Sequence, residues 1–147
     1  MHISYGSCWP NFHLYSKQNL NSFKNLNSSK VLKLSFDFTK EVKLIIHGFS
    51  SDGNSKRITL IKDSILKNND VNVIIIDWSE GAVAPDYITA KDNTKIVGKK
   101  ISEFLFMNDI NPSKVHCIGH SLGKNFFSDG AKIKFTQTFG TSLIGEL

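Results

Sequence analysis

The stretch SKVHCIGHSLGKNFFSDG, residues 113–130, decides the fold. Its apolar run VHCIG (115–119) has the length of a buried strand, and a helix can begin within 121–129. Between them, residues 119–123 read Gly-His-Ser-Leu-Gly, the G-x-S-x-G pattern of a nucleophilic serine on a sharp strand-to-helix turn. Gly119 and Gly123 would let the strand and the helix approach closely without Cβ clashes. The alternative is that the two glycines serve only a tight turn.

Strand-like and helix-like segments alternate upstream of this stretch. The runs VKLIIH (42–47) and VNVIIID (71–77) are short and rich in β-branched residues, as buried strands are. The segments 55–69 and 86–108 instead repeat apolar residues at helical spacing. The two predicted buried helix faces consist of Ile58, Ile61, Ile65 and Leu66, and of Val97, Ile101, Phe104 and Leu105.

This alternation predicts an α/β fold, with a mostly parallel sheet of three to five strands covered by helices on both faces. Short strands are also expected at FHLYS (12–16) and KLSFDF (33–38), and the C-terminal segment 133–147 can add one more. At 147 residues the chain fits a single domain, residues 1–147, in which residues 1–10 are expected to be disordered.

Composition excludes several classes of protein. The apolar fraction of 40% indicates a globular chain, and no apolar run reaches the length of a transmembrane helix. The net charge of +5 comes from scattered lysines and a single arginine, which argues against a nucleic-acid partner. Lys91, Lys95, Lys99 and Lys100 share helical spacing; they form either a solvated helix face or a face drawn to anionic lipid.

The two cysteines do not settle the compartment. Cys117 lies in an apolar run and is expected to be a buried small hydrophobe. Cys8 lies in a polar N-terminal segment and could pair with a residue outside these 147. No signal peptide is visible in the first residues.

A second element of ester-hydrolysis chemistry follows the strand at 42–47. In hydrolases with a serine on such a turn, one oxyanion-hole N–H comes from a loop after an early strand and the other from the residue after the nucleophile. Phe49, after Gly48, and Leu122 are therefore the candidate donors. His47 is interpreted as packing rather than as a hydrogen-bonding support. Asp77, at the end of the strand at 71–77, is interpreted as a capping or structural acid rather than a catalytic one.

Four blocks in this order resemble the pancreatic-type lipase family, which includes triacylglycerol lipases and secreted phospholipases A1. The blocks are KLIIHGFSSDG, VIIIDWSEGA, NTKIVGKKISEFL and SKVHCIGHSLG, and NFHLYSKQN (11–19) is similar to the family's early strand. The resemblance covers about residues 11–123. It implies an α/β-hydrolase fold, extracellular action on lipid esters or at a lipid–water interface, Ser121 as the nucleophile, and Phe49 and Leu122 as oxyanion donors.

The remaining partners of a catalytic serine are not evident in this chain. Hydrolases of this fold carry an acid and then a histidine after the serine, but every histidine here precedes or adjoins the turn, the last being His120. Glu146 is the candidate acid by spacing. Lys124, Asn125, Phe126 and Phe127 also depart from the small residues that the family prefers after the turn. We therefore expect the fold to be truncated after the turn.

Two functions remain open at this stage: a serine hydrolase of lipid esters whose catalytic half is incomplete here, and a non-catalytic lipase-like protein that binds lipid or a partner. No metal or organic cofactor is indicated. The choice between triacylglycerol and phospholipid and the oligomeric state are not determined by these residues.

Overall fold

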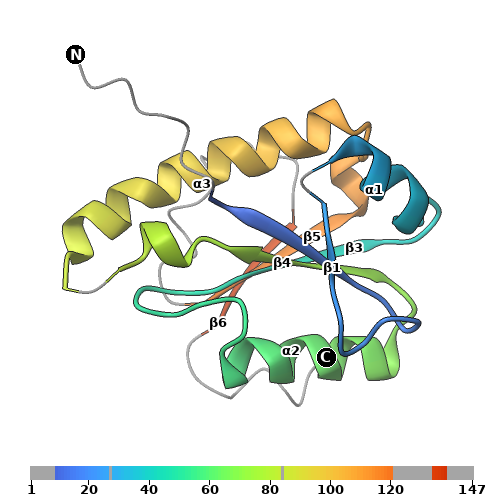
Figure 1. The fold of residues 1–147 in the computed structure, drawn as a ribbon, viewed down its shortest axis with the longest axis horizontal. Coiled ribbons are helices and arrows are strands. Elements are labelled where there is room, and N and C mark those ends of the chain that lie inside the picture. The colour runs from blue at the N-terminus through green and yellow to red at the C-terminus, as the bar shows by residue number, and fades with distance from the viewer. Residues whose placement is uncertain (1–8, 27, 84, 121–133, 139–147) are drawn as a thin grey trace.

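The computed structural model describes residues 9–26, 28–83, 85–120 and 134–138. Its helices lie on both faces of one central sheet (Figure 1). The elements in chain order are β1 (Asn11–Tyr15), β2 (Lys24–Asn25), α1 (Ser29–Ser35), β3 (Val42–Ile46), α2 (Lys56–Asn68), β4 (Asn72–Asp77), the 3₁₀ turn η1 (Ser79–Gly81), α3 (Tyr87–Met107), the 3₁₀ turn η2 (Pro112–Lys114), β5 (Val115–His120) and β6 (Lys134–Thr138).

The sheet is mixed. Within the described residues six strands follow the order β2-β1-β4-β3-β5-β6, one more strand than the upper end of the range expected from sequence. The pairs β3–β4, β3–β5 and β5–β6 are parallel, whereas β1 runs antiparallel to both β2 and β4. The two-residue strand β2 has too little apolar sequence to be recognised in advance. The α/β class is therefore confirmed, with parallel strands in the majority.

Each face of the sheet has its own apolar core, because side chains alternate between faces along a strand. On one face α1 and α3 pack over Leu44, Ile74 and Cys117. On the other face α2 packs over Ile45, Ile75 and Ile118. The predicted helix faces are confirmed: seven of the eight residues are buried, and the half-buried Phe104 stacks on Phe12 with ring centroids 4.1 Å apart.

Side-chain caps explain where the long helices begin. The Ser55 hydroxyl accepts a hydrogen bond from the Ile58 N–H at 3.4 Å, and α2 begins at the next residue. The Asp86 carboxylate accepts from the Thr89 N–H at 2.9 Å at the start of α3. Such caps satisfy N–H groups that have no partner within the helix. The predicted ranges 55–69 and 86–108 each match the observed helix to within one residue at either end.

The strand predicted at 33–38 is wrong, because this segment includes the end of helix α1. The Ser28 hydroxyl caps the helix by accepting from the Val31 N–H at 3.2 Å. Leu32 and Phe36, four residues apart, are both buried in the core, whereas Leu34 is 78% exposed. An i, i+4 apolar pair is a helical pattern, and packing on the sheet overrides the alternation that suggested a strand.

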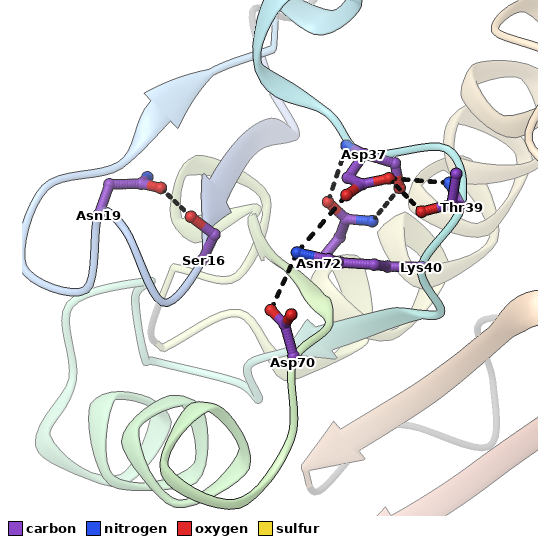
Figure 2. A network of polar contacts seen from close by, with 7 residues as sticks. All are labelled: Ser16, Asn19, Asp37, Thr39, Lys40, Asp70 and Asn72. Atoms are coloured by element: carbon purple, nitrogen blue, oxygen red, sulfur yellow. Dashed lines mark hydrogen bonds and ion pairs between the residues drawn. The ribbon is translucent and has the colours of Figure 1, made fainter.

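A polar network fixes the amino-terminal edge of β4, opposite to the edge where ligands bind in parallel sheets (Figure 2). The buried Asn72 side chain donates to the Asp37 carbonyl at 2.7 Å and accepts from the Asp37 N–H at 3.2 Å. Lys40 reaches Asp70 at 3.0 Å, and Thr39 donates to Asp37. This network joins the α1–β3 loop to β4, and it is structural.

One buried histidine makes stability depend on pH. His13 on β1 is 7% exposed, its ring stacks on Phe23 with centroids 3.8 Å apart, and its Nδ1 has no hydrogen-bond partner among the described residues. Burial lowers the pKa of His13 below its ordinary value, and the opposing field of Asp77 is the smaller effect. As the pH falls through about 6.5, His13 therefore binds a proton more readily in the unfolded chain than in the folded chain.

We expect the free energy of unfolding to fall between pH 7 and pH 5, by at most about 1.4 kcal/mol per pH unit for one histidine. Denaturant titrations at several pH values measure this slope. His13→Gln, which cannot titrate, should flatten it, and the remainder is assigned to His120, whose pKa is also lowered. An unchanged slope in His13→Gln would contradict the assignment.

Candidate active site

The carboxyl ends of β3, β4 and β5 meet at one edge of the sheet, where ligand sites form in parallel α/β folds. β3 leads into His47, Gly48 and Phe49, β4 ends at Asp77 before Trp78, and β5 ends at His120. The sequence predicted that these segments carry the site, and the structure brings them to the same edge.

His47 is a hydrogen-bonded support of this edge. Its side chain is fully buried, and Nδ1 lies 3.0 Å from the Gly48 carbonyl oxygen, so Nδ1 carries a proton and donates. Nε2 accepts from the Trp78 N–H at 3.0 Å when the ring is neutral, and it lies 3.3 Å from an Asp77 carboxylate oxygen. The interpretation of His47 as packing alone is wrong, because its partners come from β4, which local sequence does not reveal.

The carboxylate of Asp77 also supports the turn after β4. It accepts a hydrogen bond from the Ser79 N–H at 3.0 Å. A hydrogen bond from His47, made when its Nε2 is protonated, and then the hydrogen bonds from Ser79 hold the pKa of Asp77 well below its ordinary value, against the effect of burial. Gly53 lies so close that an added Cβ would be 3.2 Å from the Asp77 side chain. These contacts agree with the interpretation of Asp77 as a structural acid.

Trp78 ties the loop after β3 to the turn after β4. Its indole Nε1–H donates to the His47 carbonyl at 2.8 Å, and its ring stacks on His47 with centroids 5.6 Å apart. The Ser50 N–H donates to the Ala82 carbonyl at 2.8 Å. Ser50 has φ 57°, a left-handed conformation that is uncommon outside glycine. Because these contacts brace both sides of residues 48 and 49, the backbone there is held in place.

Phe49 follows this braced backbone. Its half-buried ring packs edge-on against Tyr87, with centroids 5.3 Å apart. Among the described residues no acceptor is found for the Phe49 N–H, although the next N–H along the chain, that of Ser50, is bonded. An oxyanion-hole donor must be an N–H group that is fixed in position and free to donate to the substrate.

β5 leads to the position of the predicted nucleophile. Gly119 is buried and pairs with Ile46 of β3, so the strand ends beside the loop that carries Phe49. Ser121, Leu122, Gly123 and Glu146 lie outside the described residues. Their predicted roles as nucleophile, oxyanion donor, turn glycine and acid therefore stay predictions, as does the helix expected within 121–129.

A cavity of about 340 Å³ adjoins Phe49 and His120 at this edge. The guanidinium of Arg57, in the first turn of α2, approaches His120 Nε2 to 2.5 Å. Sequence reasoning missed Arg57, because a polar residue on the exposed side of a predicted helix gives no signal of a neighbour 63 positions away. The cavity is lined by Phe49, Ser51, Ser55, Arg57, Ile58 and His120.

Comparison with known proteins agrees with this arrangement. The profile of the family described as Lipase matches residues 7–128. The chain belongs to the lipase family. This lipase chain is similar to the human inactive pancreatic lipase-related protein 1, with 34% identity over 119 residues, which are 76% of the chain and 25% of that protein.

Two other relatives match the chain with similar identity and over a similar share of its length. The lipase chain is 34% identical to human pancreatic triacylglycerol lipase over 118 residues, 76% of the chain and 25% of the relative. It is 31% identical to bovine pancreatic lipase-related protein 2 over 128 residues, 82% of the chain and 27% of the relative. The lipase chain thus spans about a quarter of the length of the curated relatives that it matches.

The remaining sequence predictions concern the lysines and cysteines of the lipase chain. Lys91, Lys95 and Lys99 are exposed, whereas Lys100 donates to the Trp9 carbonyl at 2.8 Å. Cys117 is buried with a free thiol, as predicted, and burial raises its pKa to about 12. Cys8 lies outside the described residues. Within the described ranges no helix is long and apolar enough to cross a membrane.

Proposed function

We propose that this chain is the nucleophile-bearing part of a serine carboxylic ester hydrolase that acts on lipid esters, of the lipase or phospholipase A1 type. The observation that carries the proposal is the braced N–H of Phe49, which has no acceptor among the described residues and lies at the sheet edge where β5 ends at His120, the residue before Ser121 in the sequence. Membership of the lipase family supports the reaction class.

In the proposed reaction the Ser121 hydroxyl oxygen attacks the ester carbonyl carbon, and a base takes the hydroxyl proton. The carbonyl oxygen becomes an oxyanion bound by the N–H groups of Phe49 and Leu122. Such a donor contributes roughly 3–4 kcal/mol of transition-state stabilisation. The tetrahedral intermediate expels the alcohol, which receives the proton, and leaves an acyl-serine that water hydrolyses. Glu146 is the candidate acid that would orient the base.

Location and partners follow from the same proposal. Action on lipid esters requires contact with a lipid–water interface, and the family resemblance favours an extracellular site of action. The exposed lysines of α3 would suit an anionic lipid surface as well as a solvated face.

A second candidate is a non-catalytic lipase-like protein that binds lipid or a partner. Two observations favour it: no histidine follows Ser121 within these 147 residues, and one relative is named an inactive pancreatic lipase-related protein. The retained serine and its flanking glycines favour the hydrolase.

The 147-residue chain by itself should show no Ser121-dependent ester hydrolysis, because an acyl-transfer serine needs a positioned base. Release of acid from a short-chain ester measures this, with Ser121→Ala as the control. Turnover by the unaltered chain that disappears in Ser121→Ala would contradict this expectation.

The hydrolase proposal is tested by sequencing the native transcript across the codons for residues 123–147 and beyond, and by assaying its complete product on emulsified triacylglycerol and phospholipid. We expect an acid and then a histidine after Ser121, together with hydrolysis. A product that binds lipid dispersions but hydrolyses neither substrate would favour the non-catalytic candidate.

A further inference from the structure

One residue that lines the cavity between the β3–α2 loop and the end of β5 is the positively charged Arg57. Its position in α2 does not stabilise that helix. Arg57 lies in the first turn of α2 beside Lys56, and that turn contains no acidic residue. A positive charge is unfavourable there because the helix dipole is positive at its N-terminus. Among the described residues, the observed ion pairs involve lysines and His47, and no carboxylate pairs with Arg57.

The contact with His120 leaves the charge of Arg57 intact. A guanidinium can only donate, so His120 Nε2, 2.5 Å away, accepts and is unprotonated. Burial and then the Arg57 charge lower the pKa of His120, which keeps the ring neutral. The pair therefore carries one positive charge, and both residues line the cavity.

The other lining groups complement a negatively charged group attached to an apolar chain. Ser51 and Ser55 line the cavity as well; the Ser55 hydroxyl accepts from the Ile58 N–H and still has its own O–H to donate. The apolar residues Phe49 and Ile58 also line the cavity. No acidic side chain is present among the described residues that line this cavity.

We propose that this cavity binds the phosphate group of a lipid ester whose scissile carbonyl lies at the Phe49 N–H, so that Arg57 selects glycerophospholipids over uncharged glycerides. The inference rests on the proposed function for the location of the scissile ester. A guanidinium binds phosphate oxygens through two parallel N–H donors, which fixes position as well as charge. In a glycerophospholipid the phosphate and the ester share one glycerol, and here Arg57 and Phe49 share one cavity.

The test is equilibrium binding to the 147-residue chain, measured by titration calorimetry. The probes are dihexanoylphosphatidic acid, uncharged dihexanoylglycerol and inorganic phosphate. Arg57→Gln should weaken binding of the phosphatidic acid about 10-fold or more and leave dihexanoylglycerol within about 2-fold. Lys56→Gln is the matched control, because it removes the neighbouring exposed charge, which does not line the cavity. It should change the affinity for phosphatidic acid and that for dihexanoylglycerol by less than about 2-fold each.

Three outcomes would overturn the inference. Equal weakening by Arg57→Gln and Lys56→Gln would show general charge attraction. Binding of inorganic phosphate as tightly as phosphatidic acid would show a free-phosphate site instead of a lipid site. Unchanged phosphatidic acid binding in a folded Arg57→Gln chain, checked by far-UV circular dichroism, would show that Arg57 has no role.

The binding assay needs no turnover, so it separates this inference from the proposed function. Loss of hydrolysis in Ser121→Ala, together with an unchanged phospholipid-to-glyceride rate ratio in Arg57→Gln, would support the hydrolase and overturn the role of Arg57. Arg57-dependent phosphatidic acid binding in a native product without hydrolysis would retain the cavity as a phosphate-lipid site and overturn the hydrolase.

Discussion

Ser121→Ala should lower ester hydrolysis by the product of the complete native transcript about 10⁴-fold or more, because removal of a catalytic nucleophile eliminates the acyl-enzyme route. The loss should appear mainly in kcat, because the proposed oxyanion donors are backbone N–H groups that this substitution leaves in place. Initial rates on emulsified triacylglycerol and on phospholipid measure it.

The matched control for this substitution is Ser113→Ala. The Ser113 hydroxyl bonds Asn111 at 2.9 Å on an exposed turn before β5, away from the carboxyl edge of the sheet. The activity of the Ser113→Ala protein should stay within about 2-fold of that of the unaltered protein, because surface substitutions usually have small effects. Hydrolysis that survives Ser121→Ala at a comparable rate would exclude Ser121 as the nucleophile.

Trp78→Ala should lower the free energy of unfolding by about 3–5 kcal/mol, the range for deletion of a large buried aromatic side chain. Trp78 is fully buried, packs in the core under α3 and donates to the His47 carbonyl. The loss is a large part of the stability of a small domain. Urea denaturation of the 147-residue chain, followed by circular dichroism, measures it.

Trp78→Phe and Phe106→Ala make this prediction specific. Phenylalanine keeps most of the apolar volume but leaves the buried His47 carbonyl without its partner, so a smaller loss of about 1–3 kcal/mol is expected. Phe106 on α3 is 85% exposed, and its replacement by alanine should cost less than about 0.5 kcal/mol. Equal losses in Trp78→Ala and Phe106→Ala would contradict the structural role of Trp78.

The fold could be predicted from sequence where burial is periodic and local. Val97, Ile101 and Leu105 recur at helical spacing and are buried on α3, and the β-branched residues of β4 are buried on both faces. Prediction failed in α1, because seven residues are too few for periodicity to separate a helix from a strand. There the core contacts of Leu32 and Phe36 decide the conformation.

The site was predicted less completely, for a physical reason. A motif locates Gly48, Phe49 and the serine turn, because backbone geometry demands glycine at fixed positions. Hydrogen bonds between side chains on different strands leave no such pattern. His47 meets Asp77 and Trp78 only after β3 and β4 pair, and Arg57 meets His120 only after β5 has joined the sheet.

The strand order also determines when the strands can pair during synthesis of the chain. β1 ends at Tyr15, but its main partner β4 begins only at Asn72. At roughly 5–20 residues per second, the ribosome finishes β1 about 3–11 seconds before β4 begins to emerge. During that interval the apolar side chains of Phe12, Leu14 and Tyr15 lack their β4 neighbours. The nascent chain therefore carries a solvent-exposed strand, which is the kind of segment that chaperones shield from premature association.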